Sequence, residues 1–268
     1  MSSDFDENSS GPQGIVEVGY DHMAEGYLGS KDPSDPETLS ALERLAETLP
    51  ERAAVLDLGC GAGVPVTRWL AEHGYNVTGV DLSARQLELA KQQAPGATFI
   101  KADMTEVSFP PGSFDAVVSF YAIIHVPREK HAALLARIAS WLTPGGPFLA
   151  TWPLTECEGT QENWEGWGAT MWWSHYSGET YQRLLVEAGF GIESAEVHEG
   201  RERWLWVVAR KDEQGRRQQI LTRMENLSEK VQLRNQDLSE SDAEALADRF
   251  AREVIEKMID EGKIKYET

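Results

Sequence analysis

The feature that most constrains this chain is a short apolar run that ends in three closely spaced glycines. Residues 53–58 (AAVLDL) have the composition of a strand buried in a parallel sheet, and Gly59, Gly61 and Gly63 follow at alternate positions. Residues 64–73 then carry a helical pattern. A strand, a glycine turn and a helix in this order form a nucleotide-type binding corner. Glycines let the backbone approach the ligand, and the free N–H groups at the start of the helix favour an electron-rich group.

A second apolar run, residues 77–80, ends at Asp81, twenty residues after Gly61. An acidic residue in this position is placed to accept hydrogen bonds from a ribose diol. The glycine spacing also separates two kinds of ligand. G-x-G-x-x-G is typical of a dinucleotide site, whereas here the glycines are closer together and Asp57 precedes them. Asp57 would repel a pyrophosphate but could bind a cationic amino group, directly or through water.

The pattern Asp57-x-Gly59-x-Gly61-x-Gly63 resembles motif I of the class I S-adenosylmethionine-dependent methyltransferases, in their small-molecule (type 11/25-like) branch, and Asp81 matches the ribose-binding acid of that family. The resemblance extends over about residues 20–211. It implies an α/β fold with a seven-stranded, mostly parallel, doubly wound sheet, helices on both faces and an antiparallel last strand. It also implies S-adenosyl-L-methionine as the cofactor and methyl transfer to an O or N atom of a small-molecule acceptor.

The same resemblance predicts cofactor contacts along the chain. Tyr20 and Tyr27 match the tyrosines of a helix that forms a lid over the cofactor in this family. An ordinary amphipathic helix that packs on the domain would show the same tyrosines. Asp103 matches an acid that accepts from the adenine amine and Met104 a backbone donor to the ring, the alternative being that Asp103 only caps a turn. The predicted cofactor residues are Tyr20, Tyr27, Asp57, Gly59, Cys60, Gly61, Gly63, Asp81, Leu82, Asp103, Met104 and Phe120.

Two histidines are candidates for a general base. Methyl transfer from a sulfonium needs the acceptor atom to be held in line with the leaving sulfur, and a base can remove the acceptor's proton. His125 follows the fourth predicted strand, and His175 lies in a tryptophan-rich segment. A structural role for His125 and catalysis by proximity alone remain alternatives. The histidines and cysteines show no metal-ligand spacing, so no metal is expected.

Residues 153–177 are the least regular part of the domain and are rich in tryptophan. In the family, the segment after the fifth strand commonly forms the acceptor side of the site, and large aromatic rings suit a planar or cationic substrate. Several of these rings could instead form a small core of their own. The predicted substrate-binding residues are Tyr121, Trp152, Trp172, Trp173 and Tyr176.

The composition of the chain disfavours several classes of binding partner. The formal net charge of −19 disfavours nucleic acid and anionic membranes, which need a basic surface. Two cysteines, Cys60 and Cys157, do not form a disulfide framework, so a reducing cytoplasm is expected. No segment has the apolar length of a membrane span, and the N-terminal residues lack the layout of a signal peptide. The expected partner is therefore a small-molecule acceptor.

The chain is expected to consist of a disordered tail (1–14), lid helices (15–50), the cofactor-binding domain (51–211, with an acceptor-side insertion at 153–177) and a helical C-terminal extension (212–268). The extension has apolar stripes that suit packing on the body or a homodimer. The rival function is a non-catalytic cofactor-binding protein that acts in assembly or regulation. A nucleotide-dependent oxidoreductase is a third alternative, which Asp57 and the glycine spacing oppose.

Overall fold

A computed structural model describes residues 11–199, 203–212 and 249 of the chain. The chain divides into two compact units, Met1–Glu213 and Gln214–Thr268, and the fold given below is that of the first. The predicted C-terminal helices, and with them the proposed dimer contact, lie outside the described residues apart from Asp212 and Arg249.

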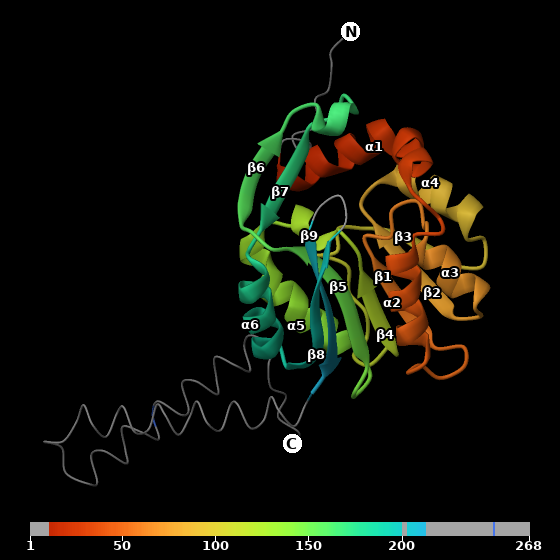
Figure 1. Cartoon of the computed structure of the whole chain (residues 1–268), viewed down its shortest axis with the longest axis vertical. Coiled ribbons are helices and arrows are strands. Elements are labelled where there is room, and N and C mark those ends of the chain that lie inside the picture. The colour runs from red at the N-terminus through yellow and green to blue at the C-terminus, as the bar shows by residue number, and fades with distance from the viewer. Residues whose placement is uncertain (1–10, 200–202, 213–248, 250–268) are drawn as a thin grey trace, which may run out of the picture. The chain divides into compact units, whose positions relative to one another are not determined.

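The first unit is built on a seven-stranded sheet (Figure 1). In spatial order its strands are β3 (Thr98–Lys101), β2 (Asn76–Asp81), β1 (Ala54–Leu58), β4 (Ala116–Ser119), β5 (Pro147–Pro153), β9 (Arg203–Lys211) and β8 (Phe190–Glu199). Neighbouring strands from β3 to β5 are parallel, whereas β9 runs antiparallel to both β5 and β8. The predicted mostly parallel sheet with an antiparallel last strand is confirmed.

Helices cover the sheet on both faces, as predicted. They are α1 (Pro12–Ser30), α2 (Pro36–Ala46), α3 (Val66–Glu72), α4 (Ala84–Gln93), α5 (His131–Trp141) and α6 (Gly178–Glu187), with short 3₁₀ turns η2 (Ile123–His125), η3 (Arg128–Lys130) and η4 (Trp164–Gly166). Successive residues of a strand point to opposite faces. Val55 accordingly packs in one core with Leu42 of α2, and Leu56 packs in the other with Leu135 of α5.

The segment after β5 is more regular than expected. It contains a two-stranded antiparallel ribbon outside the main sheet, formed by β6 (Cys157–Gln161) and β7 (Met171–His175). The sequence of β7, MWWSH, is rich in aromatic residues, which favour strands, but its lack of strict alternation hides the pattern. The tail also differs from the prediction, because α1 begins at Pro12 rather than after Gly14, and proline is favoured in the first turn of a helix.

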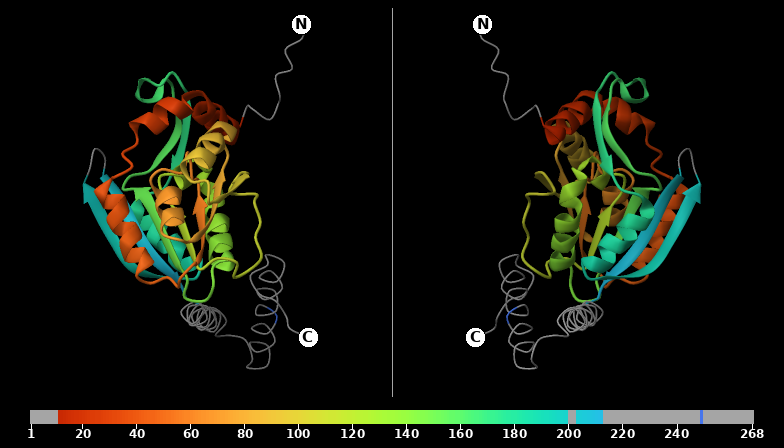
Figure 2. Two further views of the ribbon diagram at one scale, coloured as in Figure 1. Left: turned by 90° about the vertical axis from the view of Figure 1, so that its right-hand side faces the viewer. Right: turned by 90° about the vertical axis from the view of Figure 1, so that its left-hand side faces the viewer.

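Helix α1 and the ribbon form one apolar cluster, which we call the cap. Its buried members are Val16, Met23, Ala169 and Met171, and the partly buried tryptophans of the ribbon segment pack against them. Both elements lie at the same end of the first unit (Figure 2, α1 in red and the ribbon in green). Asp21 ties α1 to the start of α4, because its Oδ1 accepts from Ser83 Oγ at 2.5 Å and from the Arg85 backbone N–H at 3.1 Å.

No helix among the described residues is long and apolar enough to cross a membrane.

Candidate active site

A cavity lies where β1, β2 and β4 end, beneath α1. The order of the sheet reverses between β1 and β4, and open α/β sheets bind ligands at such switch points. The glycine loop, the ends of β2 and β3, helix α1 and the segment after β4 all contribute to its wall. Among the predicted residues it is lined by Tyr20, Tyr27, Asp57, Gly59, Cys60, Gly61, Asp81, Leu82, Asp103, Met104, Phe120, Tyr121 and His125.

The three glycines of the loop have different surroundings. Gly59 has φ of +75°, and a Cβ there would lie 2.1 Å from Ala122 Cβ, so no side chain fits. A Cβ on Gly61 would meet only Gln86 Oε1, at 3.8 Å, so that position opens toward the cavity. Gly63 does not line the cavity and lies instead against Ala90 of α4. In this structure Gly63 has a packing role behind the loop, and its predicted cofactor contact stays a prediction.

Two buried carboxylates face the cavity from β1 and β2. Asp57 Oδ2 accepts from Thr67 Oγ1 at 2.5 Å, and burial raises the pKa of Asp57 to about 7. Asp81 accepts from the backbone N–H of Gly61 (2.8 Å) and of Ser83 (2.9 Å), yet burial still raises its pKa to about 6. A bound cation or hydroxyl donor would favour the ionised form of either group.

Asp103 and Cys60 complete the polar wall. Asp103 lines the cavity and also accepts from the Thr105 N–H at 2.7 Å, so it caps a turn while facing the site. The two roles that were alternatives in the sequence are compatible in the structure. Burial, with the nearby carboxylates, raises the pKa of the Cys60 thiol and keeps it uncharged.

The side chain of Gln86 was missed by the sequence analysis. Gln86 is only 1 % exposed and lines the cavity, and neither Oε1 nor Nε2 has a hydrogen-bond partner. A buried amide without partners is costly, so a ligand with hydrogen-bonding groups would satisfy it. The sequence does contain a sign of this residue's role. Gln86 shares the buried face of α4 with Leu89 and Ala90, where a polar residue is unexpected.

Tyr20 and His125, which both line the cavity, form a hydrogen-bonded pair. His125 Nδ1 lies 2.7 Å from the carbonyl oxygen of Trp172 and therefore carries the proton, so Nε2 accepts from the Tyr20 hydroxyl at 3.0 Å. Burial lowers the pKa of His125 to about 4, and burial with nearby Tyr27 and Asp81 raises the pKa of Tyr20 well above its ordinary value. Both side chains are neutral at pH near 7.

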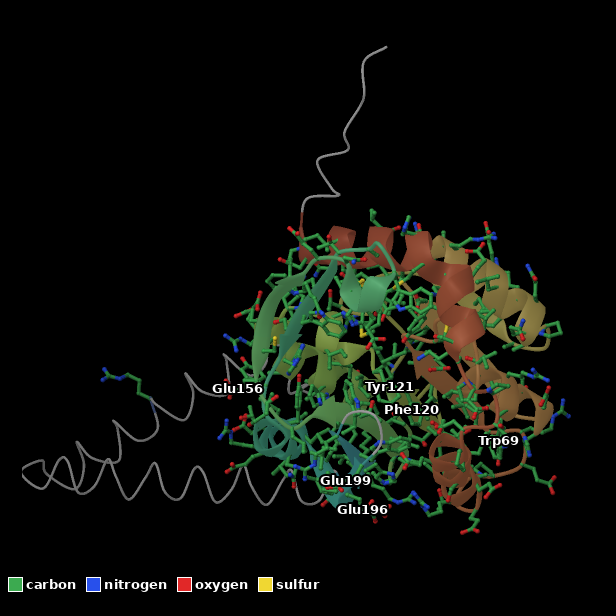
Figure 3. All side chains as sticks on the ribbon, turned by 45° about the horizontal axis from the view of Figure 1, so that its top comes forward. Trp69, Phe120, Tyr121, Glu156, Glu196 and Glu199 are labelled. Atoms are coloured by element: carbon green, nitrogen blue, oxygen red, sulfur yellow. The ribbon has the colours of Figure 1, made fainter. Side chains whose placement is uncertain are left out.

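Phe120 and Tyr121 also line the cavity, and Figure 3 shows them next to each other. Tyr121 has φ of +56°, a strained value for a residue with a side chain. Its backbone N–H donates to Thr151 Oγ1 at 2.8 Å, and its ring packs edge-on against Trp204 with centroids 4.7 Å apart. Strain of this kind is frequent at functional sites, and Tyr121 is one of the residues that line the cavity.

The three tryptophans predicted to bind the substrate do not line this cavity. Trp152 is fully buried and stacks on Tyr181 at 4.8 Å, so it belongs to the core. Neither Trp172 nor Trp173 lines the cavity. They support His125 from outside it, through the Trp172 carbonyl and through the Trp173 ring, whose centroid is 4.6 Å from that of His125.

His175 and Tyr176 also lie away from the cavity. His175 Nδ1 is 2.9 Å from the Thr155 carbonyl oxygen, and the Tyr176 ring lies 5.5 Å from the Arg128 guanidinium. The catalytic role of His175 and the substrate contact of Tyr176 stay predictions, and neither side chain lines this cavity. His175 is the last residue of β7 and pairs with Cys157 of β6, and Tyr176 directly follows the strand.

Across the part of the chain that the structure describes, no group of three or more His, Cys, Asp or Glu side chains could hold a metal ion.

Comparisons with known proteins agree with this geometry. Residues 55–146 match the family model described as a methyltransferase domain. The chain is 31% identical over 223 residues to the 27-O-demethylrifamycin SV methyltransferase of Amycolatopsis mediterranei (strain S699), a match that covers 76% of this chain and 79% of that protein.

Solved structures share the fold. The chain resembles the DhpI–SAH complex with a TM-score of 0.61 and 24% identity, over 76% of this chain and 98% of that one. A second similar structure is that of the magnesium protoporphyrin IX methyltransferase ChlM from Synechocystis PCC 6803 with bound SAM. Its TM-score is 0.59 and its identity 19%, over 75% of this chain and 98% of that one. From the motif, the fold and these relatives together, the chain belongs to the class I S-adenosylmethionine-dependent methyltransferases.

Proposed function

We propose that this enzyme transfers a methyl group to an O or N atom of a small-molecule acceptor held at the Tyr20–His125 end of the cavity. The observation that carries the proposal is the continuity of the cavity, which joins the acids at the ends of β1, β2 and β3 to Tyr20, Tyr121 and His125. The name of the Amycolatopsis relative, a methyltransferase of 27-O-demethylrifamycin SV, supports a small-molecule acceptor. The net charge of −19 argues against nucleic acid.

The polar end of the cavity fits S-adenosylmethionine. Asp81 would accept from the ribose hydroxyls and Asp57 would bind the amino group, either directly or through water. Asp103, Met104 and Leu82 would hold the adenine. The unsatisfied amide of Gln86 and the open position at Gly61 are the features of this chain that support a polar ligand here.

The cofactor supplies an electrophilic methyl group, so the protein has little covalent chemistry to perform. Its main contribution is to hold the acceptor atom in line with that methyl group and to exclude water. Tyr20, Tyr27, Phe120 and Tyr121 give this end of the cavity flat apolar walls that suit both tasks.

We assign His125 to positioning rather than to proton removal. Its Nε2 already accepts from Tyr20, and a histidine whose pKa is lowered to about 4 is a weak base at neutral pH. The Tyr20–His125 hydrogen bond holds α1 over the cavity and fixes one wall of the acceptor site.

The decisive experiment is a calorimetric titration of the purified chain with S-adenosylhomocysteine, followed by methyl-transfer assays over a panel of hydroxyl and amine acceptors. We expect binding at micromolar strength or better and turnover with at least one acceptor. A folded sample that does not bind would contradict the cofactor site. Binding without turnover over a broad panel would favour the non-catalytic rival.

We further propose that residues 212–268 are a helical extension that forms a homodimer, and that the enzyme acts in the cytoplasm. The first proposal rests on the apolar repeats at Ile220, Met224, Leu227 and Val231 and at Leu246, Phe250, Val254 and Met258. Light scattering of the full chain and of a chain that ends at Asp212 tests it, and an unchanged number of subunits would contradict it. The second rests on the low cysteine content, with Cys60 and Cys157 both free.

A further inference from the structure

A single lysine lies among the aromatic rings of the cavity. Lys31 directly follows α1 and lines the cavity, and it is half-buried. Its Nζ is 4.2 Å from the centroid of the Tyr27 ring and 5.9 Å from that of Tyr121. The ammonium is thus held between α1 and the segment after β4, at the end of the cavity where the acceptor is proposed to bind.

The charges around the cavity make this lysine exceptional. Among the described residues that line the cavity, the other charged ones are the acids Glu17, Asp57, Asp81 and Asp103, and Lys31 is the one Lys or Arg. No carboxylate among the described residues lies within ion-pair distance of its Nζ.

Two other basic side chains of the first unit illustrate the usual pairing with a carboxylate. Lys101 pairs with Glu17 at 2.7 Å, and Arg128 pairs with Glu158 at 2.7 Å. The chain has 44 acidic residues and 25 lysines and arginines, so a cation without a carboxylate is not explained by a shortage of acids. Both rings lie within cation–π range of the ammonium and hold it at the cavity without neutralising its charge.

We propose that Lys31 is the anion-binding group of this cavity and takes a carboxylate of a bound molecule. The proposal rests on the proposed function, because it assumes that the cavity holds the cofactor and the acceptor. Two molecules can bring the carboxylate: the cofactor, at its amino-acid end, or the acceptor. If the acceptor brings it, the substrate class narrows to anionic compounds, and the neighbouring Tyr27 and Tyr121 rings favour a planar one.

The test compares Lys31→Met and Lys31→Arg with the wild-type chain in two calorimetric titrations. The first uses S-adenosylhomocysteine and its decarboxylated analogue, which keeps the amino group. The second uses 4-hydroxybenzoate and the neutral 4-hydroxybenzamide, added to protein saturated with S-adenosylhomocysteine. Lys101→Met is the matched control, because it removes the same charge from a lysine that pairs with Glu17 of the cavity wall.

If the cofactor brings the carboxylate, Lys31→Met should weaken S-adenosylhomocysteine binding about tenfold, the scale of a charge-assisted hydrogen bond, and leave the decarboxylated analogue unchanged. If the acceptor brings it, S-adenosylhomocysteine binding should stay unchanged while the preference for the benzoate over the amide disappears. Lys31→Arg should keep the wild-type behaviour in either case, because it keeps the charge.

The proposal is overturned if Lys31→Met changes neither comparison, or if Lys101→Met produces the same losses, which would indicate only the general charge of the protein. Failure of the wild-type chain to bind S-adenosylhomocysteine has a different meaning, because it contradicts the proposed function itself. Wild-type binding that does not depend on Lys31 contradicts only the anion site.

Discussion

The hydroxyl oxygen of Tyr20 lies 3.0 Å from Nε2 of His125, although the two residues are 105 positions apart in the chain. Nδ1 of the same ring donates to the carbonyl oxygen of Trp172 at 2.7 Å. One imidazole therefore joins three elements: helix α1, the segment after β4 and the β6–β7 ribbon. The cap and the end of the cavity where the acceptor is proposed to bind are connected through His125.

Tyr20→Phe should loosen α1 without disturbing the core. The substitution leaves the buried Nε2 of His125 without its donor, which costs about 1–3 kcal/mol. We expect faster hydrogen exchange of the α1 amides and weaker binding of S-adenosylhomocysteine. Tyr75→Phe is a suitable control, because its hydroxyl contacts the Ala46 carbonyl at 3.5 Å, away from the cavity. Unchanged exchange in α1 would show that the hydrogen bond does not hold the cap.

Cofactor affinity should fall as the pH is lowered from about 8 to about 5.5. The free protein holds Asp57 with a pKa of about 7 and Asp81 with one of about 6, and a bound amino group and bound hydroxyls favour the ionised carboxylates. Binding therefore releases protons in this range, and affinity rises with pH.

Titrations of S-adenosylhomocysteine in buffers of different ionisation enthalpy measure this proton release. Asp57→Asn should reduce the release, since it removes one of the two groups, and should weaken binding at neutral pH. A release that is the same in the variant and the wild type would remove Asp57 from the site.

Gln86→Met should change stability and affinity in opposite directions. In the ligand-free protein the buried amide has no hydrogen-bond partner, so replacing it with an apolar side chain of similar length should raise the free energy of unfolding by about 1 kcal/mol. The same change removes a group that the ligand would satisfy, so S-adenosylhomocysteine should bind about tenfold more weakly.

Gln92→Met, at an exposed position of the same helix, controls for helix propensity. Chemical denaturation and calorimetry give the two quantities separately. A loss of stability in Gln86→Met together with unchanged affinity would show that Gln86 is a structural residue.

His131 should make the first unit less stable in acid. Its Nε2 donates to the Val126 carbonyl at 2.8 Å and its Nδ1 accepts from the Tyr181 hydroxyl at 3.0 Å, so both nitrogens are occupied by the neutral form. Burial lowers the pKa of His131 from 6.5 to about 4. Between these values the unfolded chain binds more protons than the folded one, so stability falls as the pH drops through this range.

His131→Gln removes this pH dependence, so its stability relative to the wild type should improve on acidification by on the order of 1–3 kcal/mol. Asp57 and Asp81 have the opposite effect, because their raised pKa values stabilise the folded chain in acid, but both proteins retain them. Urea denaturation at several pH values gives the difference, with His73→Gln, at an exposed position, as the control. A constant difference would mean that His131 is not held neutral.

The sequence by itself determined the fold and the polar half of the cavity. Strand β1, the glycine loop and Asp81 are consecutive or close in the chain, and their roles follow from local rules: buried parallel strands are apolar throughout, and Gly59 tolerates no side chain. Asp57 lies one residue before the end of β1, Asp81 ends β2 and Asp103 follows β3, so the parallel sheet brings them together at one edge. No distant contact is needed to place them.

Only the tertiary structure decided which aromatic and basic side chains reach the other half. His125 and His175 look alike in the sequence, yet one lies on the cavity and the other faces the ribbon, because the choice depends on how β6 and β7 pair and on where α1 packs. Trp152 stacks on Tyr181 in the core. The Gln86 amide has no hydrogen-bond partner, and Lys31 lies over the Tyr27 ring; both facts depend on contacts between segments that are distant in the chain. The direction of a side chain is set by packing between distant segments, which a local pattern does not record.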